Sequence, residues 1–102
     1  MNYFSYLDDV ESKNLFEALR TEQLQTVAIV LIHIDRDLAS DTLNMYTDES
    51  RAKIAIKMAQ IDDLPEVVVK NIANILKSKI LPRGVKLGGI KAVAEILKRL
   101  KD

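Results

Sequence analysis

The stretch that decides the fold reads LQTVAIVLIHI and spans residues 24–34. Its apolar side chains lie on every side of a helical wheel, and its β-branched content would also suit a buried strand. No second stretch of the chain offers a strand to pair with it, so we expect a helix. A helix that is apolar all round is covered by neighbours on every side. The sequence therefore predicts a central helix in an all-α domain.

The segments next to this stretch have the helical spacing of apolar residues. Before it, we expect a lead-in turn or a short helix at residues 3–7 and a helix at about residues 11–22. After it, Asp35 is expected to cap a helix, because a carboxylate accepts hydrogen bonds from the free N–H groups of a first turn. Either Thr47 or Asp48 is expected to cap the following helix. Its apolar positions are Ile54, Ala55, Met58, Ala59 and Ile61.

Two further helices are expected in the last part of the chain. Pro65 suits the first position of one helix, because its missing N–H would have no partner there. The core stripe of that helix is expected at Val68, Ile72, Ile75, Leu76 and Ile80. Pro82 and Gly84 indicate a short loop, and Gly88-Gly89 precede a last helix. About six short helices result, arranged as a compact bundle or as part of a right-handed helical repeat.

The composition excludes several function classes. The chain has 102 residues, 48% of them hydrophobic and 29% charged, which suits one globular domain. Without cysteine there is no disulfide, thiolate metal site or cysteine nucleophile. The longest apolar run, Val27 to Ile32, is far shorter than a membrane span of about 20 residues. No secretory signal is visible at Met1, and we expect a cytoplasmic protein with little catalytic equipment.

Three local patterns suggest chemistry but fit a structural interpretation better. His33 lies within the most apolar stretch and is interpreted as a core or boundary residue, since no second histidine is available. The acidic residues 35–41 lack the glycine and the final glutamate of a calcium loop. Residues 84–91 lack the strand and the Ser or Thr of a phosphate-binding loop. We therefore predict no catalytic residue, no metal ligand and no cofactor.

Charge is balanced overall but not along the chain. Up to Val69 there are 6 basic and 13 acidic residues, net −7, and from Lys70 there are 9 basic and 2 acidic residues, net +7. The simplest interpretation is a set of solvated helix faces. A second is a dipolar module that joins acidic and basic faces of like domains. Nucleic-acid binding is a third, weakened by the absence of aromatic residues after Tyr46.

Several motifs resemble one known family. Residues 88–97 read GGIKAVAEIL, and residues 22–26 read EQLQT, followed by an apolar run and Ile34-Asp35. Together with Ile54-Ala55 and residues 65–68 (PEVV), these resemble the middle domain of the bacterial flagellar motor switch protein FliG. The resemblance covers roughly residues 4–100. It implies an armadillo-like, right-handed superhelical fold and a non-enzymatic rotor component that binds the switch protein FliM.

The resemblance also implies roles for particular residues. The partner surface is expected at Glu22, Gln23, Leu24, Gln25 and Thr26. Glu22 and Gln25 match the family motif, whereas Gln23 replaces its histidine and Leu24 its proline. Gly88 and Gly89 correspond to a hinge. The expected units are residues 1–87, the armadillo-like part, and residues 88–102, the Gly-Gly joint with a terminal helix.

The same resemblance implies further partners and a location. Neighbouring FliG-type domains are expected partners, nucleic acid is not, and contact with the membrane is expected only through other rotor proteins. The expected place is the cytoplasmic face of the inner membrane, in the flagellar basal body. The alternative function is a regulatory Mg²⁺-sensing helical domain like that of MgtE-type transporters, because the part up to Val69 is acidic.

Overall fold

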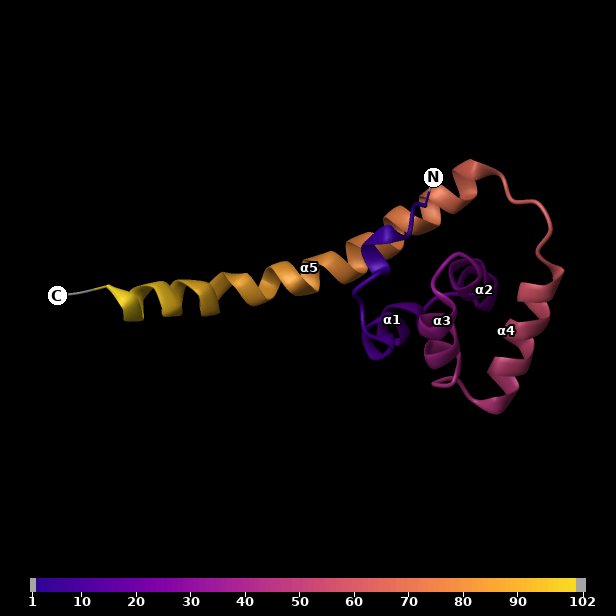
Figure 1. Ribbon diagram of the computed structural model, residues 1–102, viewed down its shortest axis with the longest axis horizontal. Helices are drawn as coiled ribbons and strands as arrows, with labels where there is room; N and C mark the ends of the chain where they lie inside the picture. The colour runs from indigo at the N-terminus through magenta and orange to yellow at the C-terminus, as the bar shows by residue number, and fades with distance from the viewer. Residues whose placement is uncertain (1, 101–102) are drawn as a thin grey trace.

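The computed structural model describes residues 2–100, apart from the side chains of residues 82–92. A 3₁₀ helix and five α-helices follow one another: η1 (Ser5–Leu7), α1 (Ser12–Leu19), α2 (Leu24–Ile32), α3 (Arg36–Leu43), α4 (Asp48–Gln60) and α5 (Glu66–Arg99). The described residues contain no strand, and the predicted all-α class is confirmed (Figure 1). An armadillo-like superhelix stays a prediction. None of the described helices is long and apolar enough to span a membrane.

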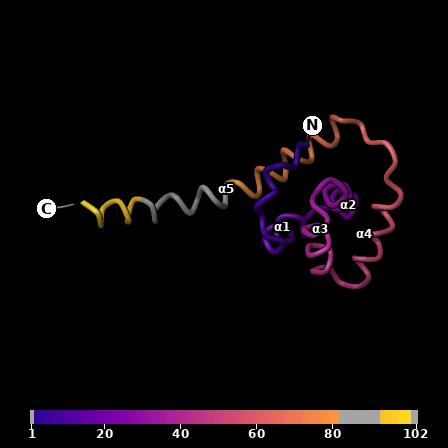
Figure 2. The backbone as a smooth tube through the Cα atoms, viewed as in Figure 1, coloured from indigo at the N-terminus to yellow at the C-terminus, as the bar shows by residue number. Residues whose placement is uncertain are grey.

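Helix α2 lies at the centre of the molecule, as its sequence predicts. Residues 27–31 are buried at consecutive positions, so every side of the helix faces another element. Helices α4 and α5 both contact α2, and α1 contacts α3 and α5. Figure 2 shows α2 surrounded by the other helices. Each large aliphatic side chain buried in this way stabilises the fold by about 1.5–3 kcal/mol.

Two helix starts have the caps that the sequence predicts. One carboxylate oxygen of Asp35 accepts from the backbone N–H groups two and three positions later, at 3.0 and 3.2 Å. The hydroxyl of Thr47 accepts from the N–H of Ser50 at 3.2 Å, so Thr47 rather than Asp48 is the cap of α4. These bonds satisfy N–H groups that have no partner inside the helix. Local sequence therefore fixes where α3 and α4 begin.

The buried face of α4 is narrower than predicted. Ile54 is fully buried and Met58 and Ile61 are partly buried, but the predicted core positions Ala55 and Ala59 are exposed. An alanine adds so little apolar area that its position on the stripe does not decide which way the helix faces. The packing of α4 on α2 therefore depends on Ile54.

The buried face of α5 is also shifted from the predicted one. Val69, Ala73 and Leu76 are buried, whereas Val68 and Ile75 are exposed. Valines occupy three consecutive positions, 67–69, so periodicity alone cannot select the face. The small side chain of Ala73 leaves room for a close approach. Helix α5 begins at Glu66, with Pro65 as its N-cap residue rather than its first helical residue.

The N-terminal segment packs along the first half of α5. The hydroxyl of Tyr6 donates to the carbonyl of Ala73 at 2.7 Å, and the Tyr3 hydroxyl donates to the carboxylate of Glu66. The ammonium of Lys77 lies 5.9 Å from the centroid of the Tyr6 ring. Figure 1 shows this segment beside α5. Residues about 63 to 67 positions apart in the sequence thus fix α5 to the rest of the molecule.

The second half of α5 extends away from the other helices (Figure 1), and the molecule measures 64 × 30 × 21 Å along its principal axes. Val93, Ile96, Leu97 and Leu100 are each more than half exposed. The sequence predicts a loop at Pro82 and Gly84 and a new helix after residue 89, whereas the structure assigns one element, Glu66–Arg99. The side chains around this expected joint lie outside the described residues. The domain boundary after residue 87 stays a prediction.

Candidate protein-interaction site

The segment Glu22–Thr26 comprises the end of the junction between α1 and α2 and the first turn of α2. The N–H of Glu22 donates to the carbonyl of Leu19 at 2.9 Å and closes the turn after α1. Gln23 is the N-cap residue of α2 and has an extended backbone, with φ −65° and ψ 149°, but its side chain makes no capping hydrogen bond. The chain therefore starts α2 without using a side chain of this segment, which leaves the polar groups of Gln23 available for other contacts.

The five residues predicted for the partner surface face in two directions. Gln23 and Gln25 are exposed, and Glu22, Leu24 and Thr26 are half-buried. Leu24 packs against the hydrophobic core rather than standing free. Glu22 and Thr26 line a small pocket toward α5. The structure thus brings Glu22 and Thr26 together on the inner side and leaves the two glutamines toward solvent.

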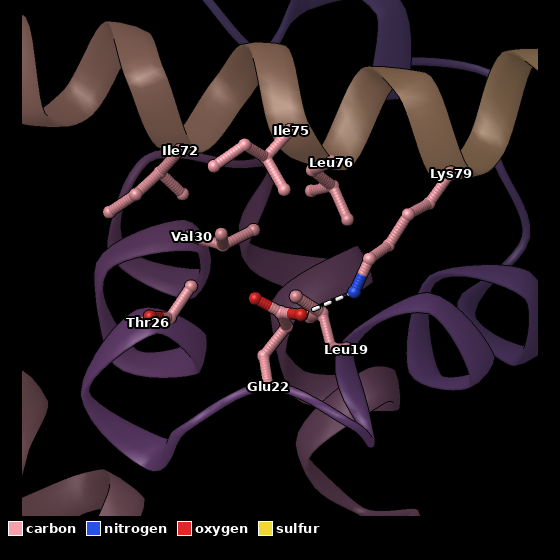
Figure 3. A pocket seen from close by; sticks show the side chains of 8 residues that line it. All are labelled: Leu19, Glu22, Thr26, Val30, Ile72, Ile75, Leu76 and Lys79. Atoms are coloured by element: carbon pink, nitrogen blue, oxygen red, sulfur yellow. Dashed lines mark hydrogen bonds and ion pairs between the residues drawn. The ribbon is translucent and has the colours of Figure 1, made fainter.

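The pocket lies between the α1–α2 junction and α5. Leu19 and Val30 line it from α1 and α2, and Ile72, Ile75 and Leu76 from α5 (Figure 3). Its volume of about 70 Å³ is far below the ~300–1,000 Å³ of a typical small-molecule site. The pocket suits a small apolar side chain rather than a cofactor.

An ion pair lies at the edge of this pocket. The ammonium of Lys79 donates to the carboxylate of Glu22 and lies 3.4 Å from the hydroxyl of Thr21. The side chain of Glu22 is 27% exposed and that of Lys79 is 32% exposed, so water screens their interaction only in part. Figure 3 shows Lys79 reaching from α5 toward Glu22. Local patterns could not single out Lys79, because the two residues are 57 positions apart.

His33 lies at the boundary of the core, as interpreted from the sequence. Its Nδ1 lies 2.6 Å from the carbonyl oxygen of Ile29, and its ring centroid lies 5.6 Å from that of Phe4. Together with Tyr3 and Glu66, His33 also lines a second, more open pocket of about 340 Å³. The hydrogen bond to Glu66 is the main cause that raises the pKa of Tyr3 above its usual value. Among residues 2–81 and 93–100, no cluster of three or more His, Asp or Glu side chains could hold a metal ion.

The fold and the site define a class of small all-α domains with an apolar pocket between three helices. Within this class, the model of the FliG middle domain matches residues 12–85. The chain belongs to the FliG middle-domain family. The resemblance predicted from the sequence is therefore confirmed.

Individual FliG proteins are also similar to the chain. The chain is 34% identical over 100 residues to a flagellar motor switch protein FliG of Helicobacter pylori and 32% identical over 101 residues to that of Thermotoga maritima. Each comparison covers 95% of this chain but only 29% and 30% of the relative. The chain therefore spans less than a third of the length of these relatives. No solved structure matches the chain.

Proposed function

We propose that the chain is a non-enzymatic protein-interaction module of the bacterial flagellar motor switch. The observation that supports this most is the family match over residues 12–85, which includes the whole segment Glu22–Thr26. The proposed partner is a FliM-type switch protein. The proposed contacts are the exposed amides of Gln23 and Gln25, together with the carboxylate of Glu22 and the neighbouring Leu24 and Thr26.

We propose that the module transmits conformational change between neighbouring rotor parts. Gly88 and Gly89 are the proposed joint, because glycine has the widest backbone freedom of any residue. Neighbouring FliG-type domains are the proposed second partners, supported by the net charges of −7 up to Val69 and +7 from Lys70. The proposed place is the cytoplasmic face of the inner membrane, reached through other rotor proteins.

Calorimetric titration of the chain with a FliM-type middle domain tests the proposed partner. We expect binding by the unaltered chain and at least a fivefold weaker affinity for Glu22→Ala and Gln25→Ala, since each loses a polar contact of about 1 kcal/mol or more. The matched control is Gln60→Ala, which removes an exposed amide at the end of α4. Failure of the unaltered chain to bind would rule out this partner.

A further inference from the structure

The predicted partner residue Glu22 already has a partner inside the molecule. Its carboxylate is paired with the ammonium of Lys79, which comes from α5. Gln25, the other residue that matches the family motif, is exposed. The two motif residues therefore differ in availability. A partner can contact the amide of Gln25 directly. At Glu22, a partner must displace the Lys79 ammonium or share the carboxylate with it.

The surroundings of Lys79 make sharing unfavourable. Lys79 lines the pocket together with Glu22, and its ammonium also donates to the hydroxyl of Thr21. A protein surface that contacts Glu22 from outside would therefore meet the ammonium of Lys79. It would have to desolvate that charge, which costs free energy unless the charge keeps a partner.

We propose that the Glu22–Lys79 ion pair is an autoinhibitory latch between the α1–α2 junction and α5, which a binding partner must open to use Glu22. The proposal rests on the proposed function, because it needs a partner that contacts Glu22. Only the fraction of molecules with an open latch binds with the full affinity, and the apparent affinity falls by that fraction. Partner binding then weakens the contact between α5 and the α1–α2 junction, and that contact weakens partner binding by the same factor.

The size of the effect follows from the exposure of the pair. Partly exposed ion pairs contribute modestly to stability, because water and salt screen them. The usual contribution of such a pair to the free energy of unfolding, converted to an equilibrium constant, corresponds to roughly a two- to fivefold change. The latch thus adjusts affinity rather than blocking binding. We expect its effect to fade at high salt, since the Debye length falls to about 3 Å at 1 M.

The first experiment measures the latch without any partner. Urea denaturation of the unaltered chain, Glu22→Gln, Lys79→Met and the double variant forms a double-mutant cycle. Methionine keeps most of the aliphatic stem that lines the pocket, so the cycle reports mainly on charge. We expect a coupling that changes the unfolding constant by roughly two- to fivefold at low salt. Additive single effects at low salt would overturn the proposal.

The second experiment measures affinity for a FliM-type middle domain by calorimetry. We expect Lys79→Met to bind roughly two- to fivefold more tightly than the unaltered chain, and the gain to disappear at high salt. The matched control is Lys70→Met, which removes an exposed positive charge from the same helix. An equal gain for both variants would indicate a general charge effect and would overturn the latch.

The outcomes separate this proposal from the proposed function. Binding that is weakened by Glu22→Ala but unchanged by Lys79→Met supports the FliM-type partner and overturns the latch. Weaker binding by Lys79→Met also overturns it, because Lys79 would then orient Glu22 for the partner. If the unaltered chain does not bind at all, the proposed partner fails and the latch fails with it, even where the denaturation cycle shows a coupled ion pair.

Discussion

Helices α2 and α5 are both rich in aliphatic residues but lie in opposite environments. Residues 27–31 of α2 are buried at consecutive positions, whereas Ile75 and Leu97 of α5 are 54% and 60% exposed. In α2 the direction of the apolar face does not matter, because neighbours cover all sides. In α5 the neighbours cover one face of the first half, and the described side chains near its end, residues 93–99, are exposed. The comparison shows that the arrangement of neighbouring helices, more than local composition, decides which aliphatic side chains are buried.

The largest expected effect comes from truncating the same residue type in the two helices. We expect Leu31→Ala in α2 to lower the free energy of unfolding by about 2–5 kcal/mol, because it removes a fully buried side chain and leaves a cavity. Leu97→Ala in α5 should change it by less than about 0.5 kcal/mol. Urea denaturation followed by circular dichroism measures both. Equal losses would mean that the end of α5 is covered in solution.

Overpacking tests the anchored half of α5. Ala73 is buried beside the N-terminal segment, and we expect Ala73→Leu to cost about 1–3 kcal/mol because the added side chain forces that segment away. The matched control is Ala55→Leu in α4, where the alanine is exposed. Differential scanning calorimetry of both variants gives the change in stability. An unchanged melting temperature for Ala73→Leu would contradict the close packing of Tyr6 on α5.

The N-cap of α3, Asp35, tests how much local hydrogen bonds stabilise the fold, separately from burial. We expect Asp35→Ala to lower the free energy of unfolding by about 1 kcal/mol, because two N–H groups of the first turn of α3 lose their acceptor. Asp41→Ala removes an exposed carboxylate later in the same helix and serves as control. Chemical denaturation compares the two. A loss at Asp41 as large as at Asp35 would point to overall charge rather than capping.

The smallest expected effect is a pH dependence carried by half-buried tyrosines. Burial raises the pKa of Tyr6 and of Tyr46 from 10.0 to about 12. A folded-state pKa above the unfolded value gives stability that is complete below about pH 10 and is lost as the pH rises toward about 12. We expect Tyr6→Phe, on the α5 side, to lose less stability than the unaltered chain over this interval. Denaturation midpoints at about pH 9 and 11 provide the measurement.

The elements that sequence reasoning placed well are those fixed by local chemistry. The apolar run of α2 and the caps Asp35 and Thr47 lie where they were expected, because each signal is contained within a few residues. The faces of α4 and α5 were misjudged. Ala55 and Ala59 carry little burial energy, and consecutive valines at 67–69 fit more than one face. Such faces are selected by contacts between segments far apart in the chain.

The candidate site could be predicted only in part for the same reason. The motif around Glu22 and Gln25 is local, and its assignment to a partner surface stays a prediction from the resemblance. The ion pair with Lys79 spans 57 positions, and no spacing within the sequence indicates it. The pocket likewise needs α1, α2 and α5 together. Sequence patterns thus indicate the segment, whereas the packing of α5 determines its surroundings.

The contact between Tyr6 and Ala73 also sets a limit on how the domain folds during synthesis. These residues are 67 positions apart, so the segment around Tyr6 cannot complete its packing until Ala73 has left the ribosome. Closing such a distant contact is slow compared with forming local helical turns. Until α5 arrives, the newly made chain exposes apolar surface that the finished domain covers. The newly made chain is therefore most prone to aggregate before α5 packs against the other helices.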